Sequence, residues 1–289
     1  MKRVYHLLLV CFCLLLAVGI AVADDKKLKA GFVYVGPVGD YGWSHAHDVG
    51  RKFAEKKLPW LETVYIESVA ESDSARIIDR FIQEEKCDVV FTTSFGYMDD
   101  TIKAGKKYPN KHFMHCSGFK QSKNVGTYMG DFYQMYYLNG LMAGAMTKSN
   151  KIGYVAAFPI PELIRHINAF AIGIKESNPK ATVHVKWIYA WYGPDKAKEA
   201  AESLIAEGCD TLAFTEDTPA VIEVGQEHTE KGKQIYTYRH YSPMQQYGVD
   251  SVVSGQLADW GVMYVQILKD IYEGTWTNKD YWWLAKEKA

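Results

Sequence analysis

Short apolar runs and stretches of helical periodicity alternate along most of the chain. The runs are rich in β-branched and aromatic residues, which is typical of strands in a sheet that is buried on both faces. Between them, apolar residues recur three or four positions apart, as they do from Ser72 to Ile82. This alternation predicts parallel sheets covered by helices on both faces. In the first half we expect strands at 28–35, 61–68, 89–92, 112–116 and 125–129, and helices at 43–57, 72–82 and 99–108.

The second half of the chain repeats the first with a constant offset of 122 residues. Four residues show this offset most clearly: Gly31, Pro37, Asp73 and Cys87 recur as Gly153, Pro159, Asp195 and Cys209. The surrounding segments match too, since KAGFVYVGP at 29–37 corresponds to KIGYVAAFP at 151–159. Because the offset holds without a gap over three predicted elements, we interpret the chain as two similar α/β halves. A ligand site is expected in the cleft between them.

A helix at 136–147 is predicted to carry the chain from the first half to the second. There the order of strand and helix repeats, and a last strand and helix follow. We expect strands at 151–157, 182–189, 210–215, 234–238 and 251–258, and helices at 162–177, 195–207, 219–231 and 259–273.

The N-terminal segment has the pattern of a secretory signal peptide. Lys2 and Arg3 precede an apolar run at 7–20, and Ala21-Val22-Ala23 supplies small residues before Asp24. The apolar run is shorter than the roughly 20 residues that a spanning helix needs. We therefore expect residues 1–23 to be removed and the mature protein to be periplasmic. An uncleaved membrane anchor is the alternative.

The charge of the mature chain argues against a nucleic-acid partner. Removing Lys2 and Arg3 from the 33 basic residues leaves 31 against 34 acidic residues, a net charge of −3. Proteins that bind nucleic acids need basic surfaces to displace counterions from phosphates. We therefore expect no nucleic acid among the partners.

Three cysteines follow the predicted signal peptide: Cys87, Cys116 and Cys209. An odd number is a poor disulfide framework, and Cys87 and Cys209 hold equivalent positions in different halves. We expect all three to be small buried hydrophobic residues rather than reactive thiols.

The loops that follow the predicted strands carry the candidate binding residues. Ligands of parallel sheets collect at the carboxyl ends of the strands. Aromatic residues recur at nearly every such end, with carboxylates near several. Aromatic faces sandwich ring-shaped ligands, and carboxylates accept hydrogen bonds from their N–H or O–H groups. The candidates are Asp40, Trp43, Phe95, Gly96, Tyr133, Phe158, Trp191, Asp217, Asp259 and Trp260.

Structural roles compete with this interpretation. Some loop aromatics would simply cap the core, and Asp40 and Asp217 each precede a predicted helix, where an aspartate commonly caps the first N–H groups. His45 and His47 have no third ligand nearby, so we expect no metal. The chain has no dinucleotide-binding, phosphate-loop or nucleophile-elbow motif. We therefore expect no cofactor and no enzymatic activity.

Several of these segments resemble the basic membrane protein family of periplasmic and lipoprotein substrate-binding proteins, which includes the purine nucleoside receptors of ABC transporters. WYGPDKAKEAA at 191–201 resembles the family stretch W-x-D-P-x-K-x-x-E-A-A. The segment from Phe132 to Gly144 resembles its strand-to-helix crossing, with Gln134 where an acidic residue is usual. The resemblance runs from about Lys27 to the end of the last helix.

The resemblance implies a two-lobed type I periplasmic binding protein fold, in which each lobe is a parallel sheet flanked by helices. Lobe 1 would comprise 27–133 and 251–274, and lobe 2 would comprise 134–250 and 275–289, with crossings near 133, 250 and 275. It also implies a monomer that closes on a small molecule and presents it to an ABC transporter permease.

The family's ligand site can be transferred residue by residue. DYGWS at 40–44 stands where nucleoside-binding members carry D-x-S-F-N, so Trp43 would stack on the base. Phe95-Gly96 matches the G-F loop, Asp217 matches the T-D loop, and Asp259-Trp260 matches the last site segment. A purine would then lie between Trp43 and Phe95 of one lobe and Phe158 or Trp191 of the other. Asp217 and Asp259 would accept hydrogen bonds, and Tyr133 would supply a hydroxyl group.

Departures from the family pattern bear on the ligand. Ser44 replaces the family's asparagine, Trp43 enlarges the stacking surface, and no basic residue can be placed toward a sugar. These differences favour a free base such as adenine over a nucleoside. Three alternatives stay open: a receptor for a sugar or other cyclic ligand, a ligand sensor for a membrane signalling receptor, and a nucleoside hydrolase that uses Asp40 and Asp217 as acid and base.

Overall fold

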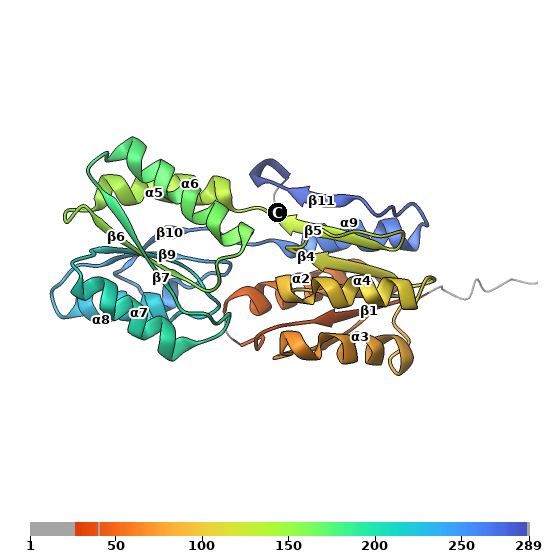
Figure 1. Cartoon of the computed structure of the whole chain (residues 1–289). Coiled ribbons are helices and arrows are strands. Elements are labelled where there is room, and N and C mark those ends of the chain that lie inside the picture. The colour runs from red at the N-terminus through yellow and green to blue at the C-terminus, as the bar shows by residue number, and fades with distance from the viewer. Residues whose placement is uncertain (1–26, 40, 288–289) are drawn as a thin grey trace, which may run out of the picture.

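The computed structural model describes residues 27–39 and 41–287 as two α/β lobes that lie side by side (Figure 1). The predicted signal peptide at 1–23 and the candidate Asp40 lie outside the described residues. Within these ranges, none of the helices has the length and apolar character needed to span a bilayer.

The first lobe is built on a sheet with the order β11-β5-β4-β3-β1-β2, in which all neighbouring strands pair in parallel. Helices α3 and α4 cover one face, and α2 and α9 cover the other. The strands are β1 (Leu28–Val33), β2 (Leu61–Ile66), β3 (Val89–Thr92), β4 (His112–Cys116), β5 (Val125–Gly130) and β11 (Asp280–Trp283). The helices are α2 (Trp43–Lys57), α3 (Ser74–Gln83), α4 (Met98–Lys107) and α9 (Trp260–Tyr272).

The second lobe is built on a parallel sheet with the order β10-β9-β8-β6-β7. The strands are β6 (Lys151–Ala156), β7 (Thr182–Trp187), β8 (Thr211–Thr215), β9 (Tyr236–Arg239) and β10 (Val252–Gly255). The helices are α5 (Tyr133–Met146), α6 (Pro161–Ser177), α7 (Pro194–Ala206) and α8 (Ala220–Glu230). Short 3₁₀ turns lie at η1 (Glu71–Asp73), η2 (Phe95–Tyr97), η3 (Gln245–Tyr247) and η4 (Ala285–Glu287). The predicted two-lobed α/β architecture is confirmed.

The sequence repeat corresponds to a repeated packing arrangement. In each lobe the first strand pairs with the next two, so β1 lies between β2 and β3, and β6 lies between β7 and β8. The repeated glycines lie under a helix. A Cβ at Gly31 would approach the Phe81 ring of α3 to 2.8 Å, and one at Gly153 would approach Leu204 of α7 to 3.0 Å. Glycine at these points therefore lets a helix pack closely on the central strand.

The three cysteines of the described chain are unpaired and buried, as predicted. Burial raises the pKa of the Cys87 thiol to about 12 and that of the Cys209 thiol to about 11. Both follow a helix that packs on its sheet, where a small apolar side chain fits the core.

The C-terminal part of the chain is divided between the lobes differently from the prediction. β10 pairs with β9 in the second lobe, although 251–274 was assigned to the first. β11 pairs with β5 in the first lobe, although 275–289 was assigned to the second. The edge of β5 offers backbone hydrogen-bonding groups, and β11 satisfies them while burying Tyr281. The described chain therefore crosses between lobes near Asp131 and between β10 and α9, and the predicted third crossing near 275 is wrong.

Candidate functional site

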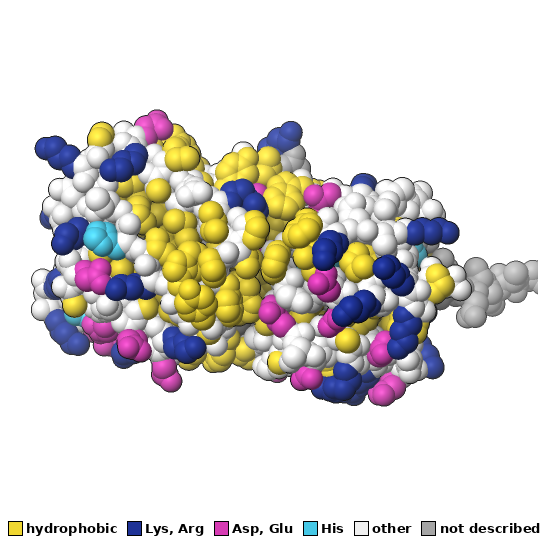
Figure 2. Space-filling view, in the orientation of Figure 1, with side chains coloured by type: hydrophobic (Ala, Val, Ile, Leu, Met, Phe, Trp, Pro, Cys, Tyr) yellow, Lys and Arg dark blue, Asp and Glu magenta, His cyan; other side chains and the backbone are white. Residues whose placement is uncertain are grey.

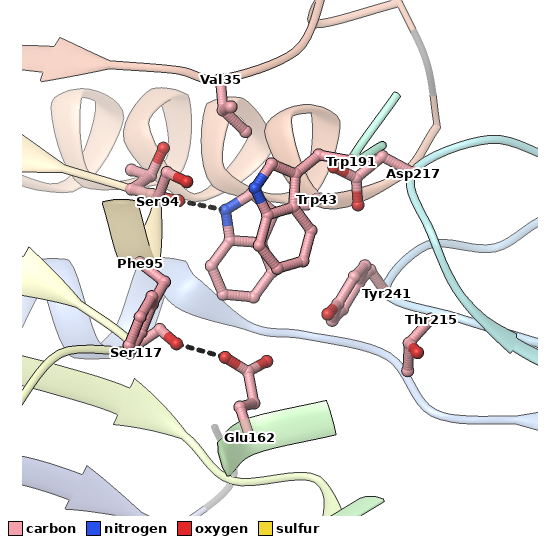
Figure 3. Close-up of a pocket in the computed structure, with 11 residues that line it drawn as sticks. Val35, Trp43, Ser94, Phe95, Ser117, Glu162, Trp191, Thr215, Asp217 and Tyr241 are labelled. Carbon is pink, nitrogen blue, oxygen red and sulfur yellow. Dashed lines mark hydrogen bonds between the residues drawn. The ribbon is translucent and has the colours of Figure 1, made fainter. Parts of the chain in front are cut away.

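A cavity lies between the lobes at the carboxyl ends of the strands (Figure 3). The first lobe contributes residues that follow β1, β3 and β4, and the second contributes residues at the ends of β7, β8 and β9 or on α6. Parallel sheets are expected to hold ligands at this position. The lining residues are Val35, Trp43, Thr93, Ser94, Phe95 and Ser117 of the first lobe, and Glu162, Trp191, Thr215, Asp217 and Tyr241 of the second.

Trp43, a predicted site residue, forms a fixed wall of this cavity. It is the first residue of α2, and its indole Nε1–H donates a hydrogen bond to the carbonyl of Thr93. Behind it lies Trp260, whose ring packs edge-on at 5.2 Å between centroids and stacks on His47 at 4.3 Å. Trp260 therefore supports Trp43 from the core instead of lining the cavity.

Trp191 forms a wall on the side of the second lobe. The ring of Phe158 packs against it at 5.0 Å between centroids, so Phe158 contacts Trp191 and does not line the cavity itself. The indole Nε1–H of Trp191 donates across the cleft to Glu71 Oε1 at 3.2 Å. A tryptophan of one lobe is therefore held by a carboxylate of the other.

Glu71 also organises the loop that carries Phe95. Its Oε1 accepts hydrogen bonds from the Ser94 hydroxyl at 2.5 Å and from the Gly96 backbone N–H at 3.0 Å. A Cβ at Gly96 would collide with the Glu71 carboxyl group, so glycine permits this approach. Gly96 therefore lies against Glu71, and its neighbour Phe95 lines the cavity.

Tyr133 and Asp259, two further predicted site residues, are not among the residues that line the cavity. Tyr133 begins α5 and lines a groove with Leu138 and Ile172 on the outer face of the second lobe. Asp259 precedes α9 and is exposed. Both residues follow a strand in the sequence, but that position does not determine the direction of a side chain.

Glu162 is a cavity residue that the sequence reasoning missed. It lies in the first turn of α6, one residue after Pro161, and is 6% exposed. The Ser117 hydroxyl of the first lobe donates a hydrogen bond to its Oε2. Burial raises the pKa of Glu162, against the opposing effects of His166 and the Ser117 hydrogen bond. Its only signal in the sequence was an acidic residue just inside a helix that follows a strand-end loop.

A buried polar cluster lies behind Glu162 at the first crossing between the lobes. Asp131 is ion-paired with Arg165 Nε at 2.8 Å, and His166 Nε2 lies 3.4 Å from the same carboxylate. The Tyr136 ring stacks on His166, and its hydroxyl group lies 2.9 Å from His240 Nδ1. Burial lowers the pKa of His240, which keeps this ring neutral near pH 7. The cluster thus fixes α6, and with it Glu162, against the crossing.

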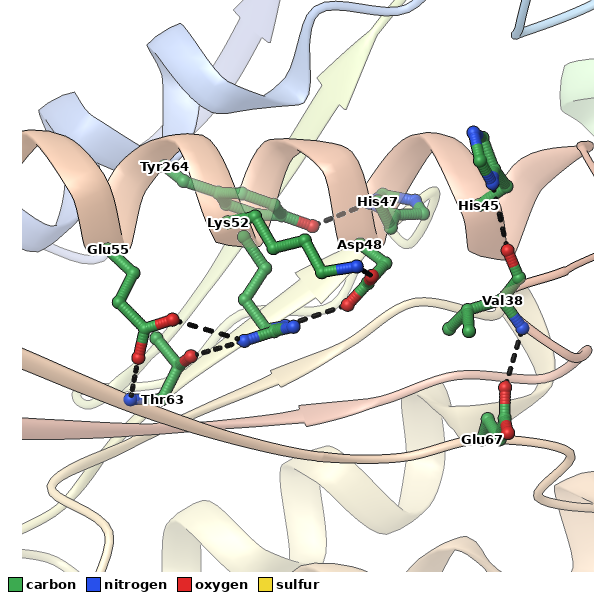
Figure 4. A network of polar contacts seen from close by, with 10 residues as sticks. Val38, His45, His47, Asp48, Lys52, Glu55, Thr63, Glu67 and Tyr264 are labelled. Atoms are coloured by element: carbon green, nitrogen blue, oxygen red, sulfur yellow. Dashed lines mark hydrogen bonds and ion pairs between the residues drawn. The ribbon is translucent and has the colours of Figure 1, made fainter.

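His45 and His47 have structural contacts rather than a shared ligand (Figure 4). His45 Nδ1 lies 2.8 Å from the carbonyl oxygen of Val38, and His47 Nδ1 lies 2.5 Å from the hydroxyl group of Tyr264. Burial lowers the pKa of His47 well below its usual value. Among the residues that the structure describes, no three His, Cys, Asp or Glu side chains gather as a metal site.

Two lobes of parallel sheets with a cavity between their strand ends define a type I periplasmic binding protein. A solute-binding protein of an ABC transporter system from Aeropyrum pernix K1 superposes on this fold with a TM-score of 0.82. It is 17% identical in sequence and matches over 90% of this chain and 75% of its own. At that identity the likeness shows the fold alone.

The sequence establishes the family. Residues 27–289 match the model of the PnrA-like ABC transporter substrate-binding proteins, and the chain belongs to this family. The resemblance to basic membrane proteins is thereby confirmed. The chain is 40% identical over 260 residues to the putative ABC transporter glucose-binding protein TsgA13 of Haloferax volcanii, covering 90% of this chain and 65% of that protein. It is 36% identical over 271 residues to the purine-binding protein BAB2_0673 of Brucella abortus, covering 93% of this chain and 76% of that protein.

Proposed function

We propose that this chain is the periplasmic solute-binding component of an ABC importer and captures a purine, with a free base such as adenine favoured over a nucleoside. The observation that carries the proposal is a cavity with aromatic walls from both lobes, Trp43 and Phe95 facing Trp191, that also contains two carboxyl groups. Closure needs only better contacts with the ligand in the closed arrangement than in the open one. The chain then acts as a monomeric receptor for a permease, without catalysis.

The aromatic walls support a flat ligand. Each stack between a base and an aromatic ring contributes about 1–3 kcal/mol in proteins that bind bases. Walls from different lobes make these contacts complete only when the lobes close, which links binding to the state that the permease receives.

The polar groups of the cavity support a neutral ligand that donates hydrogen bonds. Glu162 and Asp217 supply carboxyl groups, and none of the described lining residues is a lysine or an arginine. An anionic ligand would therefore meet like charge without compensation. The N–H groups of an aminopurine suit these acceptors, whereas urate and nucleotides do not.

The Brucella relative, named a purine-binding protein, supports the purine class without distinguishing base from nucleoside.

A sugar is the second candidate. The Haloferax relative is named a putative glucose-binding protein, and aromatic faces with carboxylates also recognise pyranoses. A competition binding experiment on refolded mature protein distinguishes a purine receptor from a sugar receptor. Labelled adenine should bind and be displaced by unlabelled adenine but not by excess glucose. Binding of labelled glucose that adenine fails to displace would overturn the purine proposal.

A further inference from the structure

A second chamber adjoins the ligand cavity on the side of Phe95. It shares Phe95, Ser117 and Glu162 with the central cavity. The hydrogen bond from the Ser117 hydroxyl to Glu162 joins the two lobes at this shared boundary (Figure 3). One side-chain contact therefore lies between the two spaces.

The outer chamber has its own chemistry. Its aromatic walls are Phe119 and Trp282, which are 67% and 38% exposed and so open to a ligand. Figure 2 shows hydrophobic side chains gathered where the two lobes meet. Arg165 lies 5.1 Å from the centre of the Trp282 ring and is ion-paired with Asp131. Because its charge is already balanced, the chamber suits a neutral hydroxylated ring, which stacks on aromatic faces, rather than a phosphate.

We propose that the outer chamber is a second subsite, which takes a hydroxylated ring attached to the ring in the central cavity. The Ser117–Glu162 hydrogen bond is the specificity-determining partition between the two. With the bond in place the protein selects an unsubstituted ring, and without it the protein also accepts the ring with its sugar. This inference rests on the proposed function in placing the first ring in the central cavity.

Ser117 offers a variant that removes the partition and preserves the fold. Its φ is +66°, in the left-handed region that glycine adopts without strain, so Ser117→Gly deletes the hydroxyl group without straining the backbone. Ser68 is the matched control, since its φ is +55°, it is exposed, and it lines neither chamber. Ser68→Gly makes the same chemical change away from the ligand.

The test is isothermal titration of wild type, Ser117→Gly and Ser68→Gly with adenine and adenosine, and with glucose and maltose. Loss of a hydrogen bond to a carboxylate predicts that Ser117→Gly improves adenosine binding relative to adenine by about tenfold or more. Ser68→Gly should keep the wild-type ratio. An unchanged ratio in Ser117→Gly overturns the partition.

Adding Trp282→Ala to Ser117→Gly tests the subsite itself, because the gained affinity for adenosine should then be lost. If it persists, the sugar does not occupy the outer chamber. If purines fail to bind but sugars bind, the purine proposal fails and the partition is tested separately with the sugars. In that case Ser117→Gly should improve the binding of maltose relative to glucose, and an unchanged ratio would overturn the partition.

Discussion

Trp191 Nε1 lies 3.2 Å from Glu71 Oε1, so the wall of one lobe is hydrogen-bonded to a carboxylate of the other. The same oxygen accepts from Ser94 and Gly96, the two neighbours of Phe95. Glu71 therefore connects the two aromatic walls of the cavity without lining it. Its contact with Trp191 depends on closure of the lobes, whereas its contacts with the Phe95 loop lie within one lobe.

Glu71→Ala should weaken ligand binding, because closure then loses a bond to a carboxylate and the Phe95 loop loses its anchor. Hydrogen bonds to charged groups contribute about 1.5–3 kcal/mol, which corresponds to a Kd at least about tenfold higher. Stopped-flow fluorescence should place most of the change in the dissociation rate. Glu84→Ala, which breaks only an exposed ion pair with Arg80, should bind as wild type does. Equal affinities for the Glu71 and Glu84 variants would refute the role of Glu71.

Trp191→Ala should lower the affinity for a purine by about 1–3 kcal/mol, the contribution of one stack. Trp191 is only partly buried, so folding should be affected little. Tyr192→Ala is the control, since this neighbouring aromatic residue is exposed and does not line the cavity. Calorimetric titration of both variants measures the difference. Wild-type affinity in Trp191→Ala would show that the aromatic walls do not hold the ligand.

Gly42→Ala should hold the lobes apart. A Cβ at Gly42 would lie 2.5 Å from the carbonyl oxygen of Asp217, a backbone atom of the other lobe. We expect a larger radius of gyration in the presence of ligand and a higher Kd than for wild type. Gly39→Ala, in the same turn, has no atom within 4 Å of the added Cβ and should close normally. Small-angle X-ray scattering with and without ligand measures the radius of gyration of each variant. Identical profiles for Gly42→Ala and Gly39→Ala would contradict this prediction.

Glu162 should make the stability of the protein depend on pH. Burial raises its pKa in the folded state above the ordinary value of 4.5, so the folded protein binds this proton more tightly than the unfolded chain. The stabilisation of the folded protein by this proton is fully present below pH 4.5, and it is lost as the pH rises through the folded-state pKa of Glu162.

Glu162→Gln should remove this part of the pH dependence. Urea denaturation between pH 4 and pH 7 should therefore give a flatter profile for Glu162→Gln than for wild type. Glu176→Gln, on the exposed face of the same helix, serves as the control. Parallel profiles for wild type and Glu162→Gln would show that Glu162 does not cause the dependence.

The sequence predicted the repeat, the lobes and part of the cavity lining. Trp43, Phe95, Trp191 and Asp217 line the cavity because the carboxyl ends of parallel strands meet at one edge, which is a local signal. The predicted contributions of Tyr133 and Asp259 rested on the same signal, which gives the position of a residue but not the direction of its side chain.

Long-range contacts were beyond the reach of sequence patterns. Glu71 and Ser117 act on residues of the other lobe, Trp191 and Glu162, and no local periodicity records such pairs. β11 was missed although its aromatic residues are typical of strands, because its hydrogen-bonding partner, β5, precedes it by about 150 residues. Both failures concern which elements meet, which only the tertiary structure determines.

The most direct test of the account is a thermal-shift panel on mature protein that has been unfolded and refolded to remove any copurified ligand. The panel comprises adenine, guanine, hypoxanthine, xanthine, urate, adenosine, guanosine and several sugars. A ligand at about 100 times its Kd adds ~2.7 kcal/mol of stability, which is readily detected. We predict a clear rise in Tm with adenine, a smaller rise with adenosine, and none with urate or sugars. A rise with sugars alone would contradict the purine assignment and leave only the two-lobed binding-protein fold.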